Sequence, residues 1–148
     1  MKNKSNFSVK NADSSSGFLL WQITTLWQRE IKISLEPFDL SHSGFVILAS
    51  LLWFNEQAIE VTQTTIIEHT KLDKMTVSKS LKTLQKNRFV DRFENESDTR
   101  AKTIILTILG EELAIKALKA VEEVDSKFFS KLTHDEKNQL NSLFLKLK

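Results

Sequence analysis

Hydrophobic and polar residues repeat along most of this chain with the period of α-helices. The segment 73–86 is the clearest case, because Val77, Leu81 and Leu84 recur at spacings of four and three and fall on one stripe. Hydroxyl and ammonium side chains occupy the other faces. The Asp73 carboxylate can accept a hydrogen bond from a first-turn N–H group, so we expect a helix that begins directly after it.

A short helix precedes this segment, and a two-stranded hairpin follows it. The segments 89–94 and 102–106 are short and rich in β-branched and aromatic residues, as strands are, and the polar stretch 95–100 separates them. Helix, turn, helix and hairpin thus succeed one another between Thr62 and Thr107. This order predicts a helix-turn-helix followed by a wing.

The predicted second helix has a basic outer face. Between Lys71 and Arg92 there are seven basic residues and two acids, whereas the whole chain has a formal charge of only +2. On charge alone, a solvated helix face is an equal alternative, but the order of the elements favours duplex DNA. Hydroxyl and ammonium groups on the early turns suit base edges and phosphates in the major groove. The residues expected to contact DNA there are Lys74, Thr76, Ser78, Lys79 and Lys82.

The tip of the predicted hairpin is charged. Arg100 lies at its far end, where a guanidinium can enter a narrow and strongly negative minor groove. Asp98 could pair with Arg100 or Arg92 and hold the hairpin in shape. An unpaired acid at a tip that faces DNA would repel phosphate.

These motifs resemble those of the MarR (multiple antibiotic resistance regulator) family of bacterial winged-helix transcription factors. Asp98-Thr99-Arg100 matches the D-x-R signature of the wing, and 106–110 matches the L-T-x-x-G motif that begins the next helix. The likeness covers roughly residues 18–148 and runs, in order, through Thr62-Gln63, Ile66-Ile67, Thr76-Val77-Ser78-Lys79, Leu84, Lys86, Val90 and Arg92.

The resemblance implies a mainly α fold with a small β-hairpin wing (α+β). A winged helix-turn-helix domain would span about 58–107, between dimerisation helices at about 18–34 and 108–148, and one domain would cover 18–148. The wing residues that the resemblance adds to the expected DNA contacts are Arg92, Asp98 and Arg100.

Three residues depart from the family pattern. Ile67 stands where Ala is usual, and Lys71 and Arg88 stand where Gly is usual. Glycine supplies a left-handed backbone that side chains resist. We therefore expect Lys71, and either Arg88 or its neighbour Asn87, to bear that conformation at some cost, unless the local geometry differs.

The flanking helices carry more apolar surface than a small core needs. The helix at 18–33 is apolar on more than one side. The last helix opens with a capping-box match at 133–136, and its apolar side has no obvious partner in the same chain. For any single residue an intrachain core is the better explanation. For the apolar residues of the flanking helices taken together, the resemblance implies another explanation. It implies a two-fold homodimer with recognition helices in successive major grooves, about 10 base pairs apart.

The family resemblance also implies a function. It predicts a sequence-specific transcriptional regulator, usually a repressor, that binds a palindromic operator and is released by a small aromatic or anionic effector. Trp21, Phe45 and Trp53 lie in the first two helices, where the family typically forms a ligand crevice, although core packing is the simpler role for such rings. The alternatives are a winged-helix module that contacts protein and a metal-responsive regulator of the same fold.

Composition excludes several other classes. The chain has 148 residues, of which 41% are apolar, enough for one domain with a core. It has no Cys, which excludes disulfides and thiolate zinc sites, and its His residues lack ligand spacing, so we expect no metal and no cofactor. No Gly-rich phosphate loop or catalytic motif is present, so we expect no enzyme.

The N-terminal segment 1–17 is rich in Ser, Asn and Lys, and we expect it to be disordered. It lacks the apolar stretch of a signal peptide, and no apolar run in the chain reaches the roughly 18 residues that span a membrane. We therefore expect a protein of the bacterial cytoplasm that does not contact the membrane.

Overall fold

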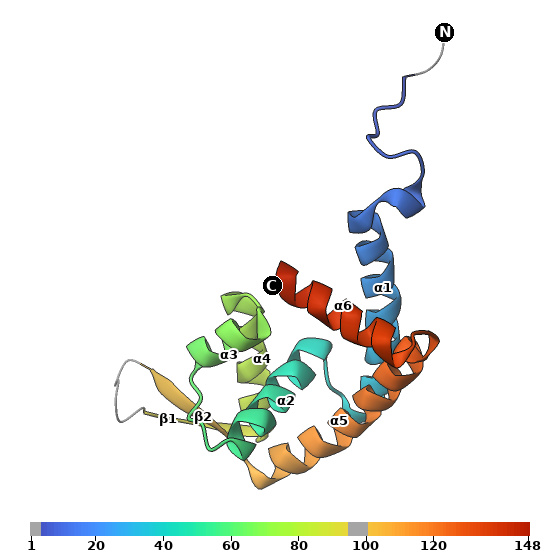
Figure 1. Ribbon diagram of the computed structural model, residues 1–148. Helices are drawn as coiled ribbons and strands as arrows, with labels where there is room; N and C mark the ends of the chain where they lie inside the picture. Colours follow the sequence, from blue (N-terminus) through green and yellow to red (C-terminus); the bar gives the residue numbers. More distant parts are fainter. Residues whose placement is uncertain (1–3, 95–100) are drawn as a thin grey trace.

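The computed structural model describes residues 4–94 and 101–148, and within them a single hairpin projects from one side of a group of helices (Figure 1). This confirms the predicted fold class, mainly α with a small β wing. The elements are α1 (Ser16–Leu35), α2 (His42–Glu56), α3 (Gln63–Thr70), α4 (Lys74–Lys86), β1 (Val90–Glu94), β2 (Lys102–Leu106), α5 (Ile108–Phe128) and α6 (His134–Leu147), with 3-10 turns at Ala12–Ser14, Glu36–Phe38 and Phe129–Lys131.

Side-chain caps set where the helices begin. Asp73 accepts from the backbone N–H of Thr76 at 2.7 Å, so α4 starts directly after it, as predicted. The capping box predicted at 133–136 is present at the start of α6. The Ser15 hydroxyl accepts from the N–H of Phe18, which starts α1 at Ser16. The segment expected to be disordered, 1–17, therefore overlaps α1 by two residues and includes a 3-10 turn.

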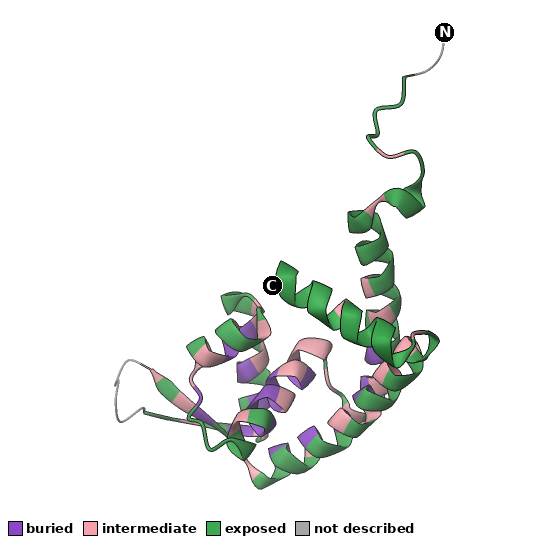
Figure 2. Cartoon of the chain, viewed as in Figure 1, coloured by how far each residue is buried: buried purple, intermediate pink, exposed green. Residues whose placement is uncertain are grey.

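Two hydrophobic clusters hold the chain together, and both include residues of α2 (Figure 2). The first joins α2, α3, α4, the hairpin and α5, and the second joins α1, α2 and α5. Full burial of a Leu or Ile side chain contributes roughly 1.5–3 kcal/mol relative to exposure. Helices α2 and α5 contribute buried residues to both clusters and thereby join them. The buried α2 side chains in the two clusters are Phe45, Ile47, Leu48, Leu51 and Leu52.

The hairpin is antiparallel and is attached to the start of α3. Its register runs from Val90 opposite Leu106 to Glu94 opposite Lys102. The backbone N–H of Ile104 donates to the carbonyl of Val61 at 2.8 Å, which fixes β2 beside the residues that lead into α3. The predicted strands are confirmed, whereas the tip residues lie outside the described part of the chain.

The turns on either side of α4 have left-handed backbone, as the missing glycines suggested. Lys71 has φ 62° and Arg88 has φ 60°, whereas Asn87 has φ −84° and is not left-handed. Each such residue costs about 1–2 kcal/mol in the left-handed region because its Cβ approaches the carbonyl oxygen. Gly110, by contrast, cannot be replaced by a residue with a side chain without a backbone shift, because a Cβ there would lie 1.9 Å from the carbonyl oxygen of Phe89.

No single helix in residues 4–94 and 101–148 is long and apolar enough to cross a membrane. Residues Ser16–Phe38 and His42–Glu56 meet the length and composition test only together, as a pair bent by 76°.

Candidate nucleic-acid interface

Helix α4 turns one face to the core and the other to solvent. Val77, Leu81 and Leu84 are buried, which confirms the predicted stripe. Among the predicted DNA-contacting residues of α4, the three lysines are exposed and the two hydroxyl residues are half-buried: Lys74, Lys79 and Lys82, and Thr76 and Ser78. The buried stripe thus fixes the orientation of a basic face.

The two hydroxyl residues have different environments. Thr76 donates its hydroxyl to the Asp73 carboxylate at 2.7 Å, so it supports the cap and retains only its acceptor lone pairs for another partner. The backbone N–H and the hydroxyl of Thr76 hold the pKa of the Asp73 carboxyl below its ordinary value. Within the described residues, the Ser78 hydroxyl has no hydrogen-bond partner. Ser78 is therefore the better placed of the two to donate to a base edge.

The predicted wing residues divide between described and undescribed parts of the chain. Asp98 and Arg100 lie outside the described residues. Arg92 lies in β1 and lines a hollow of about 500 Å³, called here the Arg92 hollow, instead of joining the α4 face. The remaining lining residues of the Arg92 hollow are Thr62, Gln63, Thr64, Ala101, Lys102 and Ile104.

The predicted aromatic wall is not assembled within one chain. Phe45 is 6% exposed and packs in the second cluster, because its side of α2 faces α1 and α5. Trp53, eight residues further along α2, is 54% exposed, and Trp21, in the part of α1 that projects from the body, is 70% exposed (Figure 1). None of the three lines either of the hollows described here.

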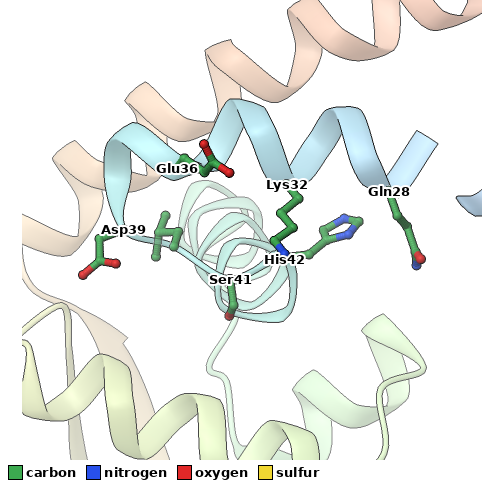
Figure 3. A pocket seen from close by; sticks show the side chains of 7 residues that line it. Gln28, Lys32, Glu36, Asp39, Ser41 and His42 are labelled. Atoms are coloured by element: carbon green, nitrogen blue, oxygen red, sulfur yellow. The ribbon is translucent and has the colours of Figure 1, made fainter. Parts of the chain in front are cut away.

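A second hollow, of about 570 Å³, lies where α1 meets the start of α2, and most of the residues that line it have polar side chains (Figure 3). Figure 3 shows Lys32 of α1 and His42 of α2 close together, with Glu36 and Asp39 farther off, in the connection between the two helices. The residues that line this His42 hollow are Gln28, Lys32, Glu36, Asp39, Leu40, Ser41 and His42. The spacing of the histidines gave no sign of this site, because its lining depends on how α1 and α2 pack.

Beside the His42 hollow, side chains of three helices meet at Trp27. The indole N–H of Trp27 in α1 donates to the Asp125 carboxylate of α5 at 2.7 Å. The Trp27 ring lies edge-on to His42, with the ring centroids 5.2 Å apart. Burial lowers the pKa of His42, and the Asp125 carboxylate raises it in part. The net effect disfavours the charged form of His42. In the described part of the chain, no three His, Asp or Glu side chains are placed to hold a metal ion.

Two apolar surfaces on the outer helices have no cover in the single chain. Helix α6 contains no buried residue, and the N-terminal half of α1 projects beyond the body (Figures 1 and 2). Large exposed apolar patches are rare on monomers and mark interaction surfaces. The side chains concerned are 39–84% exposed: Phe18, Leu19, Leu20, Trp21, Ile23 and Leu26 in α1, and Leu143, Phe144, Leu145 and Leu147 in α6.

The helix-turn-helix, its basic outward face and the attached hairpin define a winged helix-turn-helix DNA-binding protein. The family model of the ArnR1-like winged-helix domain matches residues 36–125. The uncharacterized HTH-type transcriptional regulator YdcH of Bacillus subtilis (strain 168) is 39% identical over 126 residues, which are 85% of this chain and 84% of that protein.

Solved structures agree with this result. The S. aureus MepR–DNA complex superposes with a TM-score of 0.80 at 24% identity, covering 90% of this chain and 96% of that one. The C80S mutant of MarR from E. coli, complexed with operator DNA, gives a TM-score of 0.77 at 23% identity, covering 88% and 91%. The chain belongs to the MarR family of winged helix-turn-helix transcriptional regulators, and it is not an enzyme.

Proposed function

We propose that this protein is a homodimeric repressor that binds a palindromic operator in the bacterial cytoplasm and is released by a small anionic effector. The observation that carries the DNA part is the basic outward face of α4, which the buried stripe of the same helix holds in place. Lys74, Lys79 and Lys82 supply phosphate or base contacts along it, and Ser78 supplies a hydroxyl.

The homodimer is supported by the apolar surfaces of α1 and α6. Both helices lie at the same end of the molecule, away from the hairpin (Figure 1). A second copy that covers them would bury large side chains that the single chain leaves in water. Because a two-fold dimer presents two identical recognition helices, its preferred site is a palindrome.

The effector part is supported by the His42 hollow. Its Lys32 ammonium and Ser41 hydroxyl suit a carboxylate, and the neighbouring rings of His42 and Trp27 suit an aromatic body. The opposite end of the hollow, with Glu36 and Asp39, repels a second negative charge. We therefore propose a monoanionic aromatic acid as the class of effector, held by residues other than the aromatic ones that the sequence suggested.

The decisive experiment selects fragments of genomic DNA with the purified protein and measures the affinity of the enriched site at several salt concentrations. We expect a palindromic site and a steep decrease of log K with log salt, since several phosphates are neutralised. Lys79→Ala is expected to lower the affinity, whereas Lys119→Ala, an exposed change on α5, is expected to leave it unchanged. Failure to enrich any sequence above random DNA would favour the protein-contacting alternative.

Repression is tested separately with a reporter gene under the enriched site. We expect expression to fall when the protein is supplied and to recover when an aromatic acid binds. Higher expression on supplying the protein would make it an activator.

A further inference from the structure

Met75 is the one large apolar side chain that is exposed on α4, a helix that the structure describes throughout, and its exposed fraction is 80%. It lies two positions before the buried Val77, so the helical period places it on the opposite side of α4. Lys79 and Lys82 follow it at spacings of four and three, and both are exposed. Met75 therefore lies in the middle of the basic outward face, where burial in the core contributes nothing to keeping it.

The thioether of Met75 is also the only sulfur on the recognition helix. The whole chain has no Cys and two Met, and the other Met is residue 1. A thioether exposed to solvent is open to oxidation, which converts a flexible apolar side chain into a polar sulfoxide. At neutral pH hypochlorous acid coexists with its anion, and the lysines beside Met75 raise the local concentration of that anion. The oxidisable sulfur thus lies where such an oxidant accumulates.

We propose that Met75 is a redox modification site, at which hypochlorous acid switches off operator binding reversibly. The proposal rests on the proposed DNA-binding function and adds to it a chemical input that is separate from the effector. The thioether sulfur takes the oxygen atom of hypochlorous acid and loses two electrons, which gives the sulfoxide. The chlorine is reduced to chloride, and the proton of the acid passes to water.

The position of Met75 explains why oxidation lowers the affinity. The early turns of a recognition helix approach base edges, where an apolar side chain suits a thymine methyl group. A sulfoxide placed there loses its hydration without gaining a hydrogen-bond partner. Its oxygen also lies one helical turn from Lys79 and can accept from that ammonium, which draws the cation away from the DNA. Because Met75 is exposed, neither effect disturbs the fold of the free protein.

The modification can be undone. Methionine sulfoxide reductase returns the sulfoxide to the thioether with two thiols, which form a disulfide and release the oxygen as water. Operator binding then recovers without synthesis of new protein.

The test treats the purified full chain with a limiting amount of hypochlorous acid and then with dithiothreitol, which removes chloramines from the lysines. Peptide mass spectrometry locates the added oxygen, and fluorescence anisotropy measures the affinity for the enriched operator. We expect the Kd to rise roughly tenfold on oxidation of Met75, with the melting temperature unchanged. Methionine sulfoxide reductase with dithiothreitol should restore the affinity, whereas dithiothreitol alone should not.

Met75→Leu is the matched control, because it keeps an apolar side chain and has no sulfur. Each protein is compared with itself before and after treatment, and we expect the oxidant to leave the Kd of Met75→Leu where it was. Bound operator should slow the oxidation of Met75 in the wild type, because the groove then covers the sulfur.

Three outcomes contradict the switch while leaving DNA binding intact. They are an equal loss of affinity in Met75→Leu, a fully oxidised Met75 with unchanged affinity, and equal oxidation rates with and without operator. Absence of operator binding by the untreated wild type would instead overturn the proposed function itself, and the switch with it.

Discussion

The hydroxyl of Ser43 in α2 lies 3.0 Å from the hydroxyl of Ser80 in α4. This hydrogen bond joins the recognition helix to α2, which contributes buried residues to both hydrophobic clusters. The Ser43 hydroxyl also lies 3.2 Å from that of Ser41, which caps α2 and lines the His42 hollow. Three hydroxyls therefore connect that hollow to the back of α4.

The first prediction concerns this connection. Ser80→Ala and Ser43→Ala should each lower the free energy of unfolding by about 0.5–1.5 kcal/mol, because a partly buried hydroxyl loses its partner. The double variant should cost less than the sum of the two single ones, since neither hydroxyl is then left unpaired. Urea unfolding of the four proteins measures this. Strict additivity would show that the two hydroxyls do not interact in solution.

Groove readout gives the second prediction. Ser78→Ala and Lys79→Ala should each weaken binding to the enriched operator by about 1–3 kcal/mol if the lost contact is to a base. Random duplex of equal length should be affected less, because non-specific binding depends on phosphate contacts. Fluorescence anisotropy on both duplexes gives the comparison. An equal loss on both would show that Ser78 and Lys79 touch only phosphate.

The third prediction concerns assembly. Removal of 141–148, or the single change Phe144→Glu, should convert the dimer into monomer or aggregate and abolish operator binding, because one half-site cannot supply two-site affinity. Since no residue of α6 is buried in its own chain, the winged helix of the variant should keep its far-UV circular dichroism. Sedimentation velocity checks the mass. Gln139→Glu, an exposed change on the same helix, serves as the control, and a Phe144→Glu protein that stays dimeric and binds normally would contradict the proposed interface.

The cap of α4 leads to the fourth prediction. Thr76 holds the pKa of the Asp73 carboxyl below its ordinary value, through its backbone N–H first and its hydroxyl second. The contribution of Asp73 to stability is therefore complete above the unfolded pKa and is lost as the pH falls through the lowered folded pKa. Asn accepts the same backbone hydrogen bond and does not titrate. The stability of wild type relative to Asp73→Asn should decrease on acidification from about pH 5 to about pH 2.5, and parallel pH profiles would exclude this role.

The fifth prediction concerns the effector. Salicylate should quench tryptophan fluorescence saturably and weaken operator binding in proportion, because an effector shifts an equilibrium only by its differential affinity for the two states. Lys32→Met should raise the Kd for salicylate without changing operator affinity in its absence. Quenching that is unchanged in Lys32→Met would place the ligand elsewhere, and quenching without any loss of DNA affinity would leave a binding site without regulation.

The local features of this structure could be predicted from the sequence. The stripe of α4, the Asp73 cap and the strand pattern depend on residues close together in the chain, so periodicity and cap chemistry predicted them. The left-handed backbone at Lys71 was foreseen because a glycine was missing there. For Arg88 the sequence left two positions open, and the structure chooses Arg88 over Asn87.

The hollows depend on contacts that no local pattern encodes. Trp27 and Asp125 are 98 positions apart and meet only because α1 and α5 pack side by side. Phe45 was expected near a ligand, but α2 is apolar on several sides, and its periodicity did not show which side faces α1 and α5. Arg92 was chosen from its family position, and only the packing of β1 beside the start of α3 shows that it lines a hollow there and that its Nε and Nη2 atoms are screened from solvent.

The two left-handed side chains that bracket α4 are both cations, Lys71 before it and Arg88 after it. A glycine at either place would relax the backbone and remove a positive charge next to the duplex in the same step. Folding free energy and attraction for DNA are thus set against each other at these two turns. A chain selected only for thermal stability would be expected to restore the glycines, and a chain selected for operator affinity would be expected to keep the strained cations.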